Sequence, residues 1–539
     1  MNDRELLGEI LVKNHVPRQY IDLALKEQKV SKKLIGEILL EMSLVSAELI
    51  AKAIAQQNNL KYFSIFKHDI QEGIDCDRDF LEGHQIVPIE IENGGIKVGM
   101  VNPLDTDIRD SVSRYFKREM GKHVVPVVVS RDTFQRYIEM RTRISEEQIT
   151  GALLSDTGNS NSNAENALRL LLKKAIYEKS SDIHIEPTST GGRIRMRING
   201  MLEITAAIDR QQMIRLTNIV KIASNINVVE KAMPQDGRID GSYLNDPKYE
   251  AVDFRVSTVP NRDREGSSES IVIRVLDKRT SILPLADLGM DQDTLGFLKK
   301  ARHKSHGMII FTGPTGSGKT TTIYSTMATI NTIEKAVVTV EDPVEYRNYL
   351  WKQVQVNEKR GLTFAEALRS ILRHDPDIIF CGEIRDEESA RIAFDMSNTG
   401  HLVFSTLHAN DSIKAIPRLQ GLSVGNAMIE ASILGIISQR LVRVLCEKCR
   451  EPYHDPVLGD IYRATGCGAC NHTGYKGRTM TTEYFPFDDT TREAILAAVS
   501  GNIIQSREYL SGTVSSLKSN ALQKVREGVT TIEEIERCI

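Results

Sequence analysis

The stretch GMIIFTGPTGSGKTT, residues 307–321, decides the fold of the chain around it. The apolar run GMIIFT is typical of a buried strand, GPTGSGKT fits the pattern G-x-x-x-x-G-K-[ST], and TTTIYSTMATI follows as a helix. In such a loop the glycines allow backbone N–H groups to converge on phosphate oxygens, and the helix N-terminus adds partial positive charge. A glycine-rich turn that binds nothing is the alternative, and the flanking strand and helix argue against it. The predicted nucleotide-binding residues are Gly313, Pro314, Thr315, Gly316, Ser317, Gly318, Lys319, Thr320 and Thr321, with Lys319 directed at the β- and γ-phosphates and Thr320 at magnesium.

Apolar runs alternate with helical stretches on both sides of this loop. The runs GMIIFTG, AVVTVED, DIIFCGE and HLVFSTLH have the rhythm of a mostly parallel sheet flanked by helices. Glu341 and Asp342 follow one run, and Glu383 follows another. Hydrolysis needs carboxylates that orient magnesium and activate water, and a parallel sheet collects its ligands at one edge. A helix-capping role is the alternative for each carboxylate.

A second α/β domain is predicted over residues 166–285. A helix from about residue 167 to 179 precedes the strand-like runs SDIHIEP, GRIRMRING, MLEITAA, YEAVDFRVSTV and SIVIRVLD. Arg238, Arg255 and Arg274 lie in this domain. An arginine supplied across a subunit boundary can stabilise charge on a transferring phosphoryl group, and solvated strand-face arginines are the alternative.

The N-terminal part contains a repeat. LGEILVKNHVPRQYIDLALKEQ from Leu7 aligns with IGEILLEMSLVSAELIAKAIAQQ from Ile35, a period of 28 residues, and each copy has the apolar spacing of a helical hairpin. We therefore expect a helical subdomain at 1–62. Short β-branched runs predict a small mixed α/β subdomain at 63–142, and the Gly, Ser, Asn and Asp content of 143–165 predicts a flexible linker.

Charge and hydropathy limit the kinds of partner that are expected for this chain. Lys plus Arg (69) and Asp plus Glu (72) give a net charge of −3, so no global basic field favours a nucleic-acid partner. The N-terminus lacks the apolar core and cleavage site of a secretory signal. The most apolar long stretch, residues 427–445, contains Glu430, Gln439, Arg440 and Arg443, so we expect a buried or amphipathic helix there rather than a membrane span. Any membrane association is expected to be peripheral.

Four of the seven cysteines form two pairs. Cys446 and Cys449 are separated from Cys467 and Cys470 by 17 residues, which fits the C-x2-C spacing of a structural zinc ribbon. Free buried cysteines or two disulfides are the alternative, and reducing cytosol disfavours disulfides. We expect zinc in an element at 441–485.

Ordered motifs around the loop identify a family. SSDIHIEP, PQDGRI, DFRVST, TVEDPVEY, LRSILRHDPDIIFCGEIRD, TGHLVFSTLHANDS and SQRLVRVLCEKC occur in this order over residues 180–449. With them the chain resembles, over nearly its whole length, the hexameric ATPases of type II secretion and type IV pilus assembly.

The resemblance implies an α/β fold class. It implies a RecA-like P-loop motor domain with a parallel-sheet core at 286–539, preceded by a PAS-like α/β domain and the helical and mixed N-terminal region. It also implies that the acidic box is Glu341, Asp342 and Glu345, that Glu383 positions the attacking water, and that His401 and His408 form the histidine box, with His408 at the γ-phosphate. Arg255 and Arg274 match arginines that the family presents to the nucleotide. Assembly-type members carry a tetracysteine zinc element.

The chain departs from the family at several positions. Asn199 stands where Asp is usual, and SSES at 267–270 replaces a tighter Gly-Glu turn. The N-terminal repeats resemble a domain that binds cyclic di-GMP in some relatives, but both starting arginines are absent, and His15 and Ser43 replace later glycines. Arginine is the residue best suited to stack on guanine, so cyclic di-GMP binding is not expected and a docking module for partner proteins is favoured.

The sequence thus predicts a cytoplasmic ATP-hydrolysing homohexamer at the inner-membrane face that uses Mg-ATP to power type IV pilus assembly, with an inner-membrane platform protein as its partner. A type II secretion ATPase that drives pseudopilus assembly is the alternative. A nucleotide-gated scaffold with little turnover is the alternative of another class, and a DNA motor is disfavoured by the net charge.

Overall fold

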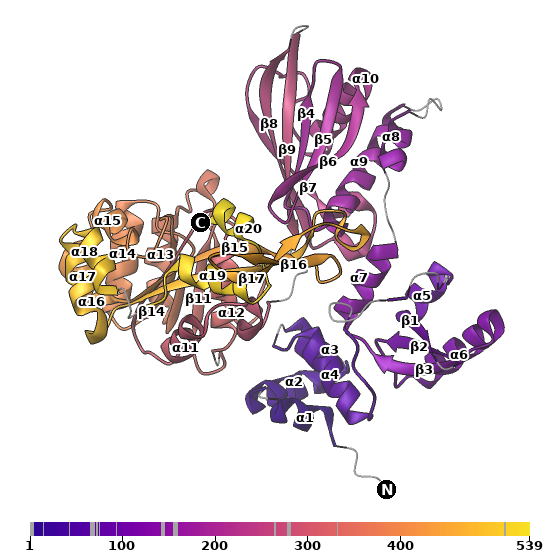
Figure 1. The fold of residues 1–539 in the computed structure, drawn as a ribbon, viewed down its shortest axis with the longest axis horizontal. Coiled ribbons are helices and arrows are strands. Elements are labelled where there is room, and N and C mark those ends of the chain that lie inside the picture. Colours follow the sequence, from indigo (N-terminus) through magenta and orange to yellow (C-terminus); the bar gives the residue numbers. More distant parts are fainter. Residues whose placement is uncertain are drawn as a thin grey trace. The chain divides into compact units, whose positions relative to one another are not determined.

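The fold is built from two units, Met1–Arg279 and Thr280–Ile539, and each is described by itself (Figure 1). The computed structural model describes residues 5–14, 16–42, 44–64, 70–71, 74, 76–92, 94–141, 146–154, 160–263, 266–277, 282–330, 332–510 and 514–539. His15 and Ser43 lie outside the described residues. Within these ranges, no helix is long and apolar enough to cross a membrane.

Four helices carry the repeat at the start of the first unit. They are α1 (Leu7–Lys13), α2 (Arg18–Ser31), α3 (Ile35–Glu41) and α4 (Ala47–Gln57). Equivalent positions of the two copies, Ile10 and Ile38, are buried in one shared core. At Gly8 a Cβ would lie 2.8 Å from Ile21, so this glycine allows α1 and α2 to approach closely. The repeat therefore buries its apolar faces copy against copy.

A small α/β layer follows the helices. Its sheet has the order β1-β2-β3, with β1 (Ile86–Glu92) antiparallel to β2 (Gly95–Met100) and β2 parallel to β3 (His123–Val128). The helices of this layer are α5 (Arg78–His84), α6 (Thr106–Met120) and α7 (Arg131–Arg141).

The predicted flexible linker is corrected where the structure describes it. Helix α8 (Glu146–Leu154) buries Ile149 and Leu153 in the core beneath the next sheet, and α9 begins within the predicted linker, at Ser160–Tyr177. Ile149 and Leu153 are four residues apart and therefore share one face of a helix. This apolar pair holds the segment against the domain despite its polar composition.

The second sheet of the first unit is antiparallel throughout. Its order is β6-β5-β4-β9-β8-β7. The side chains of alternate residues face α9 and α10 (Arg210–Ala223) and form the core, and the others form a polar face. The strands are β4 (Asp182–Pro187), β5 (Gly191–Ile198), β6 (Met201–Asp209), β7 (Gln235–Asp240), β8 (Val252–Asp263) and β9 (Gly266–Asp277).

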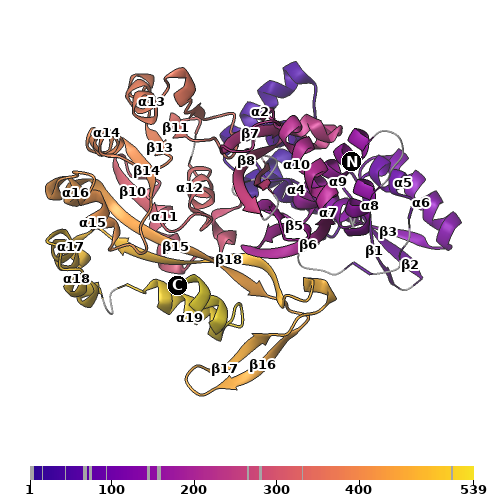
Figure 2. The same ribbon diagram turned by 90° about the horizontal axis from the view of Figure 1, so that it is seen from above.

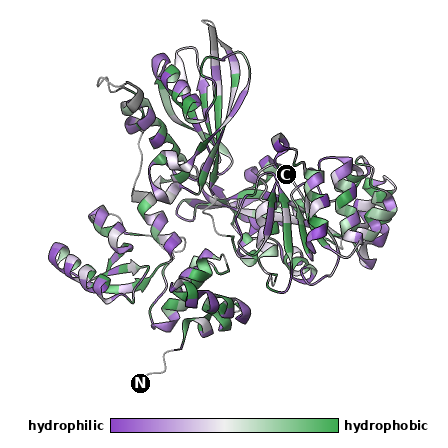
Figure 3. Ribbon diagram, turned by 180° about the vertical axis from the view of Figure 1, so that it is seen from behind, coloured by the Kyte–Doolittle hydropathy of each residue, from purple (hydrophilic) through white to green (hydrophobic). Residues whose placement is uncertain are grey.

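A seven-stranded sheet forms the centre of the second unit. Its order is β12-β11-β13-β14-β10-β15-β18, and only β18 runs antiparallel to its neighbour. Successive residues of β10, Ile309 and Ile310, enter two different cores, one on each face of the sheet. Hydrophobic residues accordingly run along these strands in Figure 3. The strands are β10 (Gly307–Thr312), β11 (Val337–Glu341), β12 (Lys352–Gln355), β13 (Ile378–Cys381), β14 (Leu402–Leu407), β15 (Ile433–Leu445) and β18 (Tyr475–Pro486).

Helices cover both faces of this sheet. Helices α11 and α12 pack on one face, and α13 to α17 pack on the other. They are α11 (Gln292–Ala301), α12 (Lys319–Met327), α13 (Phe364–Ile371), α14 (Glu387–Asn398), α15 (Ala415–Gln420), α16 (Asn426–Ser432) and α17 (Arg492–Val499), followed by α18 (Ile503–Leu510), α19 (Leu517–Arg526) and α20 (Ile532–Cys538).

The helix predicted over residues 427–445 is wrong. Only α16 is helical there, and β15 occupies the rest because it lies between β10 and β18 and is covered on both faces. The two-stranded hairpin of β16 (Arg450–Asp455) and β17 (Gly459–Ala464) follows and extends from the large sheet (Figure 2). The cysteine pairs lie at its base.

Candidate functional site

The glycine-rich loop connects β10 to α12, as the sequence predicts. Gly316 and Gly318 have φ angles of +80° and +86°, which residues with a side chain rarely adopt. At Gly313 a Cβ would lie 2.6 Å from the carbonyl oxygen of Gln439, so a larger residue would push the loop away from β15. The side-chain amide of Gln439 donates to the carbonyl of Ser317 at 2.7 Å. The loop therefore curls over the N-terminus of α12, the geometry that binds phosphate.

Lys319 closes this loop. Its Nζ donates to the carbonyl oxygens of Gly313 and Pro314 at 2.7 and 3.1 Å. Burial, with the nearby charge of Arg440, lowers the pKa of Lys319 to about 8. A phosphate would stabilise the charged form of this lysine, so anion binding and protonation are coupled here.

A charged cluster lies at the carboxyl edge of the same sheet. Glu383 follows β13, His408 follows β14 and Asp342 follows β11. His408 Nε2 lies 3.5 Å from Glu383 Oε2, and Arg385 contacts the carboxylate of Glu383 and lies 3.7 Å from Asp342. Burial, followed by the charges of Lys319 and Arg385, lowers the pKa of His408, so its imidazole is neutral at pH 7. The cluster therefore adjoins the phosphate loop, and it includes Arg385, which the sequence analysis missed although it stands two residues after Glu383.

Glu341 differs from its neighbour Asp342. Its carboxylate is buried and accepts hydrogen bonds from the hydroxyls of Tyr324 and Thr339 at 2.7 and 2.6 Å. Burial raises the pKa of Glu341 above its usual value. Tyr324 comes from α12, so Glu341 links β11 to the helix that follows the loop, whereas Glu345 is exposed.

His401 lies at the other end of β14 from His408. Leu402 pairs with Gly307 and Leu407 pairs with Thr312, so His401 stands beside the start of β10 and His408 beside its end. His401 is held there through Nδ1 by the carbonyl of Met396 at 2.9 Å. Within one chain the structure therefore does not bring His401 to the loop that follows Thr312.

The three predicted arginines form one row across the antiparallel sheet. Arg238 pairs with Arg255, and Arg255 pairs with Arg274. Arg274 pairs in turn with Asp182, and Asp182 pairs with Arg197 on β5. We call these five residues the arginine row. Like charges opposite one another destabilise a sheet unless counter-charges or a ligand compensate them.

Carboxylates compensate all but one member of the row. Asp253 lies 2.7 Å from Arg238, and Asp182 lies 3.0 Å from Arg274 and 3.6 Å from Arg197. Arg255 is exposed and has no ion-pair partner among the described residues. Asp182, Asp253 and Arg197 were not among the residues predicted from the sequence, in which the alternation of Arg193, Arg195 and Arg197 on β5 was the available signal. The row offers one uncompensated guanidinium to an anion.

The four paired cysteines converge at the base of the β16–β17 hairpin. Their Sγ atoms all lie within 4.8 Å of one another, at 3.9 Å for Cys446 and Cys467 and 3.7 Å for Cys449 and Cys470. The N–H groups of Cys467 and Gly474 donate to Cys470 Sγ at 3.2 Å, which suits a thiolate. Such a cluster could hold a metal ion.

These features define the class of the protein. The glycine loop, the parallel sheet and the carboxyl-edge cluster are those of a P-loop nucleoside triphosphatase. The solved structure of the ATPase DotB from Legionella pneumophila shares the fold: it is 20% identical, with a TM-score of 0.52, and the match covers 69% of this chain and 94% of that one. The RecA-like α/β class predicted from the sequence is thus confirmed.

The family follows from the sequence comparisons. Residues 158–537 match the family described as Type II/IV secretion system protein, and residues 59–148 match the MshEN domain. Among curated relatives, the type II secretion system ATPase E of Vibrio cholerae is 40% identical over 69% of this chain and 74% of its own length. The type IV pilus assembly ATPase PilB of Myxococcus xanthus is 32% identical over 98% of both chains. The chain belongs to this family of secretion and pilus ATPases and is an ATP hydrolase, which confirms the resemblance.

Proposed function

We propose that this ATPase powers type IV pilus assembly, the extrusion of pilin subunits from the inner membrane. The observation that carries the proposal is the extent of the match: PilB of Myxococcus xanthus aligns over 98% of this chain and PilB of Thermus thermophilus over 93%, whereas the secretion ATPase of Vibrio cholerae aligns over 69%. A type II secretion role, with pseudopilus assembly as the work done, is the second candidate, favoured by the higher identity of 40%.

We propose the following roles around ATP. The residues of the loop from Gly313 to Thr321 cradle the phosphates, and Lys319 binds the β- and γ-phosphates. Glu383 orients the attacking water, neutral His408 donates toward the γ-phosphate, and Arg255 with Arg274 and Arg238 compensates the charge that develops in the transition state. The geometry of Glu341 supports a positioning role through Tyr324 rather than direct contact. His401 would have to contact the nucleotide of another subunit, because the phosphate loop of its own chain lies at the opposite edge of the sheet.

Magnesium suits the donors at this edge. The hydroxyl of Thr320 and the carboxylates of Asp342 and Glu383 are the hard oxygen ligands that Mg²⁺ prefers, and the bound ion would neutralise phosphate charge. These residues are proposed to hold it together with the phosphates.

Zinc suits the cysteine cluster. A tetrahedral ion with Zn–S bonds of about 2.3 Å separates its sulfurs by about 3.8 Å, and the Sγ distances of 3.7 and 3.9 Å match that spacing. We propose a closed structural site at Cys446, Cys449, Cys467 and Cys470. Elemental analysis of protein purified under reducing conditions should find one zinc per chain, and about none after Cys467→Ser with Cys470→Ser.

We propose that the protein works as a homohexamer on the cytoplasmic face of the inner membrane, held there by a platform protein. Size-exclusion chromatography with light scattering in the presence of ATP tests the hexamer. Cross-linking in cells tests the membrane partner.

The cellular test separates the two candidate functions. In the organism that encodes the chain, deletion of its gene should abolish surface pili, and a plasmid copy should restore them. Loss of exoprotein secretion with pili intact would instead support the type II secretion role.

A further inference from the structure

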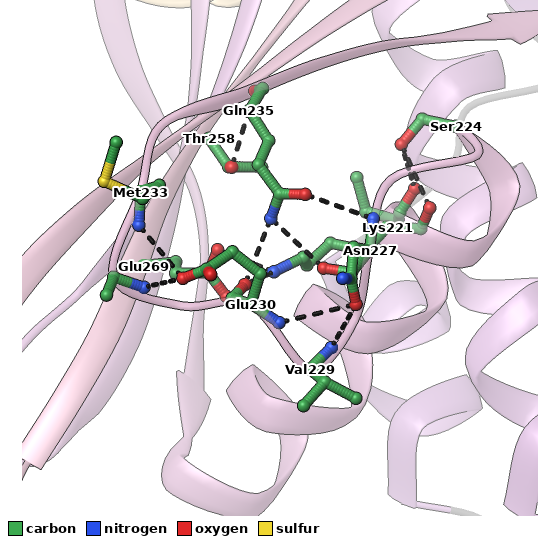
Figure 4. A network of polar contacts seen from close by, with 11 residues as sticks. Lys221, Ser224, Asn227, Val229, Glu230, Met233, Gln235, Thr258 and Glu269 are labelled. Carbon is green, nitrogen blue, oxygen red and sulfur yellow. Dashed lines mark hydrogen bonds and ion pairs between the residues drawn. The ribbon is translucent and has the colours of Figure 1, made fainter.

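A buried ion pair lies in the antiparallel-sheet domain, away from the arginine row. Lys221, on α10, is fully buried, and Glu269, on β9, is nearly so. Lys221 Nζ donates to both carboxylate oxygens of Glu269, at 2.8 and 2.9 Å, and to the carbonyl of Glu230 at 2.6 Å (Figure 4). Removing two charges from water is expensive, and apolar replacements of such pairs often preserve or increase stability. The pair therefore calls for an explanation other than stability.

The third bond of Lys221 anchors the loop between α10 and β7. Gln235 Nε2 donates to the carbonyls of Asn227 and Glu230 at 3.1 and 3.0 Å, and Gln235 Oε1 accepts from the N–H of Asn227 at 3.2 Å. The Glu230 carboxylate accepts from the N–H groups of Ala232 and Met233. Figure 4 shows Lys221, Asn227, Glu230 and Gln235 joined in one network of hydrogen bonds. Polar contacts thus organise this loop.

Apolar contacts contribute little at the loop's tip. Val229 is 87% exposed and Met233 is 62% exposed. Hydrophobic burial therefore does not hold these two side chains in place, and the hydrogen bonds around Lys221, Glu230 and Gln235 carry more of the ordering than in a packed segment.

The loop leads directly into the strand that carries Arg238. Among the described strands, β7 is an edge strand that pairs only with β8. On its other side the N–H of Arg238 donates to the carbonyl of Ser224 at 3.2 Å, and a Cβ at Gly237 would lie 2.4 Å from that oxygen. The end of α10 and the anchored loop therefore fix where β7 lies, and Arg238 is three residues beyond Gln235.

We propose that Lys221 and Glu269 are positioning residues for ATP hydrolysis: they anchor the 225–234 loop and so hold β7 and Arg238 in register at the end of the arginine row. This inference rests on the proposed role of the row in compensating phosphoryl charge. A guanidinium displaced by about 1 Å loses much of its effect on the transition state.

The test replaces both charges together, so that neither is left buried alone. Full-length Lys221→Met with Glu269→Leu is compared with wild type by thermal unfolding, by hydrogen exchange of residues 225–240, and by the kcat and KM for ATP. Lys174→Met with Glu178→Leu removes another ion pair of the same domain, between α9 and the residue that follows it, and serves as the matched control. We expect an unchanged or higher melting temperature, faster exchange over 225–240, a kcat lowered about tenfold and a KM within about twofold of wild type.

A double-mutant cycle with Arg238→Gln decides whether the pair acts through Arg238. In the Arg238→Gln background the double replacement should lower kcat by less than about twofold further, because the group it positions is already gone. Unchanged exchange over 225–240 would overturn the proposal, and so would a kcat effect that is absent or that adds fully to that of Arg238→Gln. If Arg255→Gln alone leaves kcat unchanged, the proposed function of the row fails instead, and that result is separate from the exchange measurement.

Discussion

The two large sheets of this protein present their charged residues in different ways. In the parallel sheet, Asp342, Glu383 and His408 stand just after the ends of strands, and Lys319 begins the helix α12 that follows the glycine-rich loop. In the antiparallel sheet, the arginine row lies across the flat polar face, one residue from each of five strands. The first arrangement depends on where strands end, and the second depends on how strands pair.

The difference also appears in how charge is balanced. At the parallel edge Glu383 is in contact with Arg385 and near His408, so the cluster is mixed in sign. In the arginine row, Asp182 and Asp253 compensate their neighbours, and Arg255 alone has no ion-pair partner among the residues described. A mixed cluster suits the handling of a proton or water, whereas an uncompensated cation suits the stabilisation of developing negative charge.

The largest expected effect is at the parallel edge. Glu383→Gln should lower kcat about 1,000-fold because the amide cannot orient and polarise water as the carboxylate does, while ATP binding persists. Steady-state phosphate release and equilibrium binding of a fluorescent ATP analogue measure the two effects. Glu387→Gln, an exposed neighbour on α14, is the control and should be silent. Equal phosphate release by wild type and Glu383→Gln would favour the scaffold alternative over the motor.

The next effect tests the row. Arg255→Gln should lower kcat about 100-fold, the order of effect seen when one charge-stabilising donor is removed from a transition state. Arg195→Gln, on the same sheet face but paired with Glu186, should cost less than about threefold. Both variants are assayed at matched oligomeric state by light scattering. Equal losses for the two would mean that the absence of a carboxylate partner at Arg255 has no functional meaning.

The two ends of β14 provide a smaller contrast. His408→Ala should lower kcat about tenfold, which corresponds to one hydrogen bond to a charged group. His401→Ala should stay within about twofold, because its Nδ1 bonds to the carbonyl of Met396 and the hydroxyl of Thr399 near the opposite edge. Single-turnover phosphate release separates this effect from product release. A larger loss for His401→Ala would show that a neighbouring subunit brings this histidine to ATP.

The same contrast between strand ends and strand pairing explains how much of each region the sequence predicts. The loop of 313–321 and the strands beside it are encoded locally, so composition and spacing were sufficient to place Lys319 and Glu383. The arginine row needs the register of five strands whose residues span positions 182–274, and no local pattern states that register. The sequence therefore predicted three of its arginines, Arg255 and Arg274 by resemblance and Arg238 as a further candidate, and none of the carboxylates that hold them.

Two errors have a related cause. Residues 433–445 are mostly apolar because β15 is covered on both faces, and such a run cannot be told from a buried helix by periodicity. Arg443, which argued for an amphipathic helix, pairs with the buried carboxylate of Glu534 at 2.7 Å, a partner 91 residues away. The 146–154 segment was predicted as linker because its two core residues, Ile149 and Leu153, are too few to outweigh its polar composition in a sequence pattern.

The smallest expected effect is on the pH dependence of ATP binding. The pKa of Lys319 is lowered to about 8 by burial, so this lysine loses its proton as the pH rises through 8 in the nucleotide-free protein. Bound phosphates favour the charged lysine and raise its pKa, so binding above pH 8 must take up a proton. ATP affinity should therefore fall about fourfold between pH 7 and pH 8.5. Calorimetry at pH 8.5 in buffers of different ionisation enthalpy should detect proton uptake that nearly vanishes at pH 7. Arg255→Gln does not alter Lys319, so the pH profile of binding should be unchanged in this variant. A profile that flattens in Arg255→Gln would contradict the assignment of the pH dependence to Lys319 alone.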